Sequence, residues 1–181
     1  MRPTAVFVLF LALPFAATAA TFEPDPAAAL REVRFEANQG QGHAGAAFVA
    51  RASGRAIAFD DESLALRLGG GIVRLRFAAP GARPEARLHE PLPGATHYLL
   101  GNDRSRWVTG VEGFGRLDYR GVAPGVDARF YGRGAELEFD LVLEAGVDPR
   151  RVELAVEGAD DLSLDDEGRL VVARNGDTLA L

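Results

Sequence analysis

The sequence feature that most constrains the fold is a two-residue alternation of apolar and charged side chains, repeated in short runs. Between positions 135 and 143, apolar residues fall at every second place, with Glu136, Glu138 and Asp140 between them. Because side chains of a strand point alternately to opposite faces, this pattern predicts a half-buried strand whose carboxylates face water. The same alternation predicts further strands at 64–68, 72–77 and 152–156.

Turn-forming residues separate these runs, which predicts that consecutive strands are joined as hairpins. Asn175-Gly176 is the strongest signal, because both central residues of a type I′ turn need positive φ. Other predicted turns are Ser53-Gly54, Gly69-Gly70-Gly71, Gly132-Arg133-Gly134 and Asp166-Glu167-Gly168. We therefore expect an all-β fold, an antiparallel β-sandwich or open barrel built from successive hairpins. One short N-terminal helix is also expected at 25–30, with Asp25 as its N-cap and Pro26 at its first position.

The N-terminus has the pattern of a secretory signal peptide. Arg2 precedes an apolar run at 5–15, and Ala17-Thr18-Ala19 then offers the small residues that signal peptidase accepts. The run is shorter than the roughly 20 residues that span a bilayer, so removal after Ala19 or Ala20 is expected rather than anchoring. The predicted organisation is a signal peptide at 1–20, a segment with the short helix at 21–34, and a β-rich domain at 35–181. The mature protein would be periplasmic, on the cell surface or secreted, without a membrane span.

Composition excludes several chemistries. The chain has no cysteine and no lysine, so disulfides, thiolate catalysis, Schiff bases and the phosphate-loop lysine are all excluded. Its net charge is -6, with acidic residues mixed among arginines. This balance argues against nucleic acid as a partner and disfavours anionic membrane surfaces.

Several stretches resemble one family, the β-rich domain of unknown function at the N-terminus of bacterial exported proteins that carry seven-bladed β-propeller repeats. The matching stretches are 35–41 (FEANQGQ), 98–103 (YLLGND) with Trp107, 119–127 (YRGVAPGVD), 130–132 (FYG), 137–140 (LEFD) and 146–149 (GVDP). The resemblance implies a β-rich fold and an envelope or secreted location, and it brings no catalytic residues. Family members continue with more strands and then the propeller repeats. With the strand that has only begun at 178–181, this suggests a chain truncated at its C-terminal end.

Residues that could carry chemistry are few and lack the spacing of known sites. His89 and His97 flank Pro91-Leu92-Pro93-Gly94, and a turn there would bring them together as metal ligands, although no third ligand is evident. A third histidine, His43, has no such neighbour. None of the serines lies in a G-x-S-x-G motif; they are Ser53, Ser63, Ser105 and Ser163. We expect no metal, no cofactor and no catalytic residue at these positions.

Acidic and aromatic residues leave two further alternatives open. Glu138 and Asp140 could act as the paired carboxylates of a glycosidase, but their strand face is expected to be solvated. The turn at 165–168 could bind Ca²⁺ weakly, although it lacks a calcium-loop spacing. Trp107, Tyr98 and Tyr119 could form a sugar-binding platform, although a place in the core is the more common one for large aromatics. Asn38 and Gln39 are expected to satisfy backbone groups in a tight loop.

The function that these patterns favour is a non-catalytic structural or interaction module of an exported bacterial protein. Its expected partners are other extracellular domains or envelope components. The alternatives from other classes are a polysaccharide hydrolase with paired carboxylates and a carbohydrate- or calcium-binding adhesion module.

Overall fold

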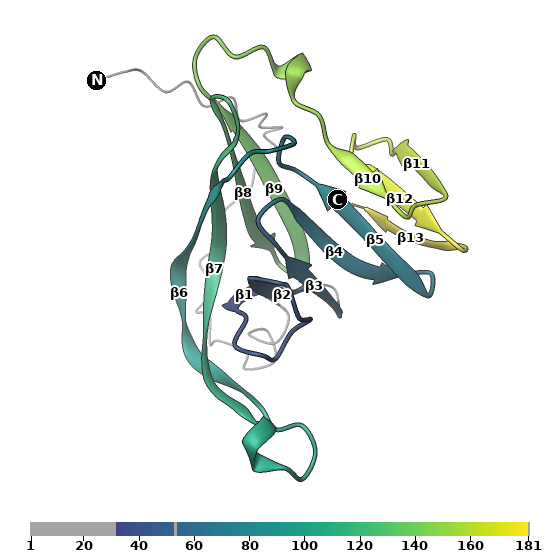
Figure 1. The fold of residues 1–181 in the computed structure, drawn as a ribbon. Helices are drawn as coiled ribbons and strands as arrows, with labels where there is room; N and C mark the ends of the chain where they lie inside the picture. Colours follow the sequence, from purple (N-terminus) through teal and green to yellow (C-terminus); the bar gives the residue numbers. More distant parts are fainter. Residues whose placement is uncertain (1–31, 53, 181) are drawn as a thin grey trace, which may run out of the picture.

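The computed structural model describes residues 32–52 and 54–180, and within them the chain is mostly antiparallel β-structure (Figure 1). The strands are β1 (Arg34–Ala37), β2 (Phe48–Ala52), β3 (Arg55–Phe59), β4 (Ser63–Leu68), β5 (Gly71–Arg76), β6 (Glu85–Tyr98), β7 (Val108–Ala123), β8 (Val126–Arg133), β9 (Glu136–Leu143), β10 (Ala155–Glu157), β11 (Asp161–Leu164), β12 (Leu170–Arg174) and β13 (Asp177–Ala180). Two single turns of 3₁₀ helix, η1 (Arg104–Arg106) and η2 (Pro149–Arg151), are the helical segments of this part. The all-β prediction is confirmed, and the short helix expected at 25–30 lies outside the described residues.

The larger sheet curls into a half-barrel because β7 is shared along its length. The strand order is β10-β5-β4-β3-β2-β1-β7-β8-β9, and β6 also pairs with β7. At Leu117, β7 pairs with β6 on one side and β8 on the other, whereas at Phe114 it pairs with β6 and β1. Strands β8 and β1 therefore follow one another along the same edge of β7. The strands that continue from each of them form two layers that face each other across the core (Figure 1).

Aromatic rings fill the space between these layers. The ring of Phe130 on β8 is fully buried, and its centroid lies 5.1 Å from that of Phe59 on β3 and 5.0 Å from that of Phe77. The apolar residues expected to face inward on β4 and β5 are buried as well: Leu64, Leu66, Leu68, Val73 and Leu75. The two-residue alternation thus correctly predicted which side of each strand packs into the core.

Most predicted hairpins are present, with small shifts at their ends. Asn175 and Gly176 have φ values of 48° and 83°, as the predicted type I′ turn requires. The turn expected at 132–134 lies slightly later, because β8 continues through Gly132 and Arg133. The strand expected at 152–156 is reduced to β10. Residues 152–154 form no regular element; they follow η2, whose end is marked by the N–H of Val152 donating to the Pro149 carbonyl.

The small sheet of β11, β12 and β13 is joined to the large sheet through two hairpin turns. The side chain of Asn175 donates to the carbonyl of Gly69 at 2.7 Å, and the N–H of Gly69 donates to the carboxylate of Asp177 at 3.1 Å. Gly69 has a φ of 53°, and a Cβ atom at this position would overlap the carbonyl oxygen of Arg174. The joint therefore requires glycine for both its backbone conformation and its close approach.

Replacing Gly69 with Ala should loosen the joint between the two sheets. We expect a loss of about 1–3 kcal/mol in the free energy of unfolding, because the added methyl group pushes against backbone that cannot retract. Gly70→Ala is the matched control: Gly70 also has positive φ (75°), but a Cβ there meets open space. Urea denaturation of both variants measures the difference, and equal losses would show that backbone strain alone accounts for the effect.

A long hairpin of β6 and β7 extends from the body as an arm (Figure 1). No strand was predicted over 85–98 or 108–123, so this element is the largest part of the fold that the sequence patterns missed. The run Pro91-Leu92-Pro93-Gly94, interpreted as a turn, instead lies inside β6, where the pairing with β7 shifts register between Pro91 and Ala95. Because the turn is absent, His89 and His97 sit on one strand, about 26 Å apart by strand rise.

One buried carboxylate fastens the arm to the body. Glu36 on β1 is 4% exposed and accepts hydrogen bonds from the hydroxyls of Thr96 at 2.7 Å and Tyr98 at 2.5 Å, both on β6. Arg34, two residues earlier, donates to the carbonyl of Gly94 at 2.8 Å. The first strand of the body therefore holds the arm at the distal end of β6, and the tip, residues 99–107, follows directly after these contacts.

Candidate functional site

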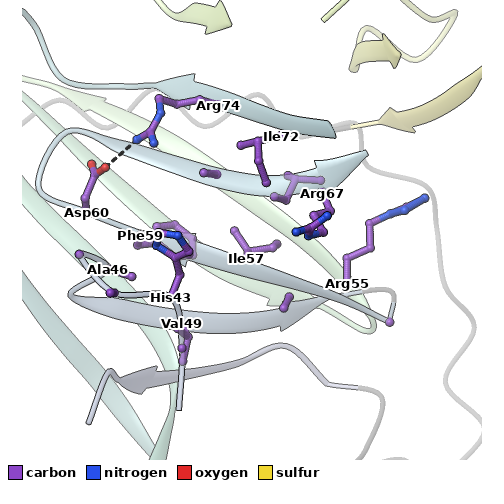
Figure 2. A pocket seen from close by; sticks show the side chains of 18 residues that line it. His43, Ala46, Val49, Arg55, Ile57, Phe59, Asp60, Arg67, Ile72 and Arg74 are labelled. Atoms are coloured by element: carbon purple, nitrogen blue, oxygen red, sulfur yellow. Dashed lines mark hydrogen bonds and ion pairs between the residues drawn. The ribbon is translucent and has the colours of Figure 1, made fainter. Parts of the chain in front are cut away.

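A groove of about 620 Å³ lies on the outward face of β2 to β5 (Figure 2). Its floor comes from the register of these strands, which places Val49, Ala58, Ala65 and Arg74 side by side in one row. The neighbouring inward positions carry Ile57, Phe59, Leu64 and Leu66, which are buried in the core. The outward positions of the central strands are mostly alanine, so the floor is apolar and flat.

The loop that follows β1 forms one wall of the groove, and Asn38 shapes it. The Asn38 side chain donates to the carbonyls of His43 and Ala46, and its oxygen accepts from the N–H groups of Gly40 and Gly42. This confirms that Asn38 satisfies backbone groups in a tight loop. Gln39 contributes through its backbone, whose N–H donates to the side chain of Gln41.

A polar cluster of Asp60, Ser63 and Arg74 closes one end of the groove. The Asp60 carboxylate accepts from the N–H groups of Glu62 and Ser63, from the Ser63 hydroxyl, and from Arg74 at 2.8 Å. Partial burial opposes ionisation of Asp60, but these hydrogen bonds together hold its pKa below the usual value. The carboxylate is therefore ionised at neutral pH, and the turn between β3 and β4 occupies its lone pairs.

At the other end, Arg55 and Arg67 border the groove (Figure 2). Neither guanidinium has a hydrogen-bond or ion-pair partner among the described residues. Most other arginines of the larger sheet's outer surface are paired; Arg76, for example, contacts Glu62 at 2.5 Å. The groove thus offers a flat apolar floor with unpaired cations at one end, an arrangement suited to contact rather than to proton transfer.

Comparison with known families identifies the chain. A family model described as Domain of unknown function (DUF7948) matches residues 35–180. The chain belongs to this family. No curated protein and no solved structure matches it.

In this DUF7948 domain, the two carboxylates considered as a glycosidase pair are used in contacts on β8 and β9. Glu138 contacts Arg133 at 3.1 Å, and Asp140 accepts a hydrogen bond from the hydroxyl of Tyr131 at 3.2 Å. Both side chains are partly buried rather than fully solvated, and neither lines the groove. Their strand face alternates with the core face, where Leu137, Phe139 and Leu141 pack, and side chains of the neighbouring strand β8 cover the two carboxylates in part.

The other candidate residues are spread across the DUF7948 domain. His89 Nε2 lies 3.6 Å from Asp118, and His97 Nδ1 accepts from the N–H of Gly110. Ser63 and Ser105 donate to Asp60 and Asp103 respectively, while Ser53 lies outside the described residues.

Metal-ligating groups are likewise dispersed. In the turn at 165–168, which was considered as a calcium site, the Asp165 carboxylate accepts from the backbone N–H groups of Glu167 and Arg169 and from the Arg169 side chain. Within residues 32–52 and 54–180, no group of three or more His, Asp or Glu side chains is arranged to hold a metal ion. Nor does any helix of the described part have the length and apolar character to cross a bilayer.

The three aromatic residues considered as a platform lie in different places. Tyr119 is fully buried in the core, as expected for a large aromatic. Trp107, in contrast, lies at the tip of the arm, where its Nε1 donates to the carbonyl of Gly101 and its ring faces Arg104. Tyr98 is the last residue of β6, next to the tip, and donates to Glu36. They form no common surface, and the expectation of a core position was wrong for Trp107.

All three tyrosine hydroxyls donate hydrogen bonds: Tyr98 and Tyr131 donate to carboxylates, and Tyr119 donates to the backbone carbonyl of Asp60. Burial is the main factor that raises the pKa of each above its usual value of 10, and Tyr131 reaches about 12. Between pH 10 and pH 12 the unfolded chain has lost tyrosine protons that the native state still holds. Stability should therefore decrease as pH rises through this range. Tyrosinate absorbance of native and urea-unfolded protein measures the shift, and superimposable titration curves would contradict it.

Proposed function

We propose that the chain is a non-catalytic structural or interaction module of an exported bacterial protein, acting in the periplasm, on the cell surface or outside the cell. Its partners would be neighbouring extracellular domains or envelope components. The N-terminal pattern of Arg2, an apolar run and Ala17-Thr18-Ala19 supports export. The family match supports a β-rich domain without an assigned activity.

The proposal that the module is non-catalytic rests on the pKa and the hydrogen bonds of the carboxylate that lines the groove. Asp60 is the single acidic residue among the described residues that line the groove. A general acid at neutral pH needs a raised pKa, whereas the pKa of Asp60 is lowered and its oxygens are already hydrogen-bonded. An apolar floor with unpaired Arg67 at its border is better suited to holding an acidic segment of a neighbouring domain.

Export can be tested by expressing the full chain in a bacterial host and measuring the intact mass of the periplasmic protein. Cleavage after Ala19 or Ala20 is expected. A variant with both residues changed to Leu should keep the precursor mass, because signal peptidase requires small side chains. Recovery of the uncleaved wild-type chain from the cytoplasm alone would refute export.

The absence of catalysis can be tested on the same material with a panel of envelope polysaccharides and ester substrates. We expect no turnover above the rate in buffer. Turnover that is lost in Glu138→Gln or Asp140→Asn would replace this proposal with a glycosidase, because those residues are the alternative acid pair. The two variants also serve as folding controls, since their side chains keep the size of the originals.

A further inference from the structure

The tip of the arm, residues 99–107, presents apolar and cationic side chains to solvent. Leu99 and Leu100 are neighbours in the sequence, and both of these large apolar side chains are exposed, at 56% and 60%. Arg104 and Arg106 are exposed on the same tip, and Trp107 is only partly buried. Exposed leucines, arginines and a tryptophan at the end of a protruding hairpin are unusual for a surface that contacts only water.

The tip is held in one conformation before it meets any partner. The Asp103 carboxylate caps η1 by accepting from the N–H and hydroxyl of Ser105. Trp107 Nε1 donates to the Gly101 carbonyl at 3.1 Å, and the guanidinium of Arg104 lies 5.2 Å from the centre of the indole ring. Because these contacts fix the loop, little conformational entropy is lost when the leucines are buried by a partner.

From these features we propose that the tip of the arm docks onto an anionic phospholipid surface, with Leu99 and Leu100 entering the boundary between headgroups and acyl chains. Leucine suits the apolar side of that boundary, tryptophan is enriched at the headgroup level, and arginine pairs with lipid phosphates. Docking is peripheral and requires no membrane span. It is independent of the proposed role of the groove, because none of the described residues of the tip lines the groove.

Local charge selects the lipid surface as the partner. The chain as a whole carries a charge of -6, and on that basis an anionic membrane is disfavoured. The tip differs: residues 99–107 hold two arginines against one aspartate, and the carboxylate of that Asp103 is occupied by Ser105. An acidic body with a cationic tip is oriented by an anionic surface, which attracts the tip and repels the body.

The chain's one tryptophan provides a direct measurement. Full-length protein is mixed with vesicles of equal parts phosphatidylglycerol and phosphatidylcholine, and the emission of Trp107 is recorded together with co-sedimentation. The apolar N-terminal run can itself bind lipid, so the emission of Trp107 is needed because it reports the tip alone. We expect a blue shift with these vesicles and a weaker one with phosphatidylcholine alone or at high salt. Sedimentation without a change in Trp107 emission would overturn the proposal.

Variants of the tip and a matched control pair distinguish docking by the tip from nonspecific adsorption through any exposed leucine. Leu99→Ser with Leu100→Ser should weaken the lipid affinity reported by Trp107 at least about ten-fold, since two buried side chains are lost. Leu162→Ser with Leu164→Ser is the control, because those leucines on β11 are 47% and 71% exposed but lie away from the arm. Arg104→Gln with Arg106→Gln should abolish the preference for phosphatidylglycerol. Equal effects of the two leucine pairs, or no binding by the wild type to either vesicle, would refute membrane docking and leave a protein pocket as the tip's partner.

Discussion

Replacing Phe130 with Ala is expected to lower the free energy of unfolding by about 3–5 kcal/mol, the range for removal of a buried aromatic ring. Phe130 connects the two layers of the half-barrel. Its ring lies within 6.0 Å of the rings of Phe59, Phe77 and Tyr119 and 5.8 Å from that of Phe139. These neighbours come from four different segments of the chain, so they cannot all move inward to fill the space that the ring leaves.

Urea denaturation followed by far-ultraviolet circular dichroism measures this loss. Ile72→Ala is a suitable control, because Ile72 is 50% exposed on the outward face of β5 and should lose no more than about 1 kcal/mol. Phe130→Leu, which keeps an apolar side chain in the site, should lose less than Phe130→Ala. If Phe130→Ala and Ile72→Ala were equally stable, Phe130 would not join the two layers in one shared core.

Replacing Glu36 with Ala is expected to lower the free energy of unfolding by about 2–4 kcal/mol and to release the distal end of the arm. The substitution leaves the hydroxyls of Thr96 and Tyr98 without their acceptor, and hydrogen bonds to a charged group are worth about 1.5–3 kcal/mol each. Because these hydroxyls can partly turn to water once the arm moves, the loss should be smaller than the sum. Hydrogen exchange should increase over 92–113 more than in β8 and β9.

Glu112→Ala provides the matched control for this prediction, since Glu112 is an exposed acid on β7 in the same arm. It should change neither stability nor exchange appreciably. A double-mutant cycle with Tyr98→Phe would then isolate the Glu36–Tyr98 hydrogen bond. Additive effects of the two substitutions would show that Tyr98 does not depend on Glu36.

Short-range pattern predicted the strands of the body well because each of them has one face in the core. The two strands of the arm, β6 and β7, were not predicted from the sequence, and there is a physical reason for this. Proline is excluded from central strands but is tolerated where the missing N–H would face solvent, and β6 pairs only with β7. Pro91 and Pro93 therefore looked like a turn although they lie within an edge strand. Trp107 was misplaced for the same reason, since without the arm no exposed tip could be foreseen.

The groove and the Glu36 contact were beyond sequence pattern because both depend on partners far along the chain. Neither Ala58 nor Ala65 indicates a site from its own sequence position. They form part of the groove floor only because the strand register places them side by side. Glu36 occupies one outward position in a short strand, and the hydroxyls that donate to it, those of Thr96 and Tyr98, are about sixty residues away in the sequence. Alternation predicts which way a side chain points, but it does not predict which distant residue it meets.

The shared edge of β7 has a consequence for the time at which the protein can fold. Strands β1 to β5 are neighbours in sequence and can assemble early, but Phe35 finds its partner Phe114 only after β7 has been synthesised. Since synthesis starts at the N-terminus, β1 to β5 are therefore complete while the side of the core that β7 and β8 contribute is still missing. Closure must wait for the later strands, so such non-local pairing makes folding slow. During that interval the uncovered apolar faces are prone to aggregation.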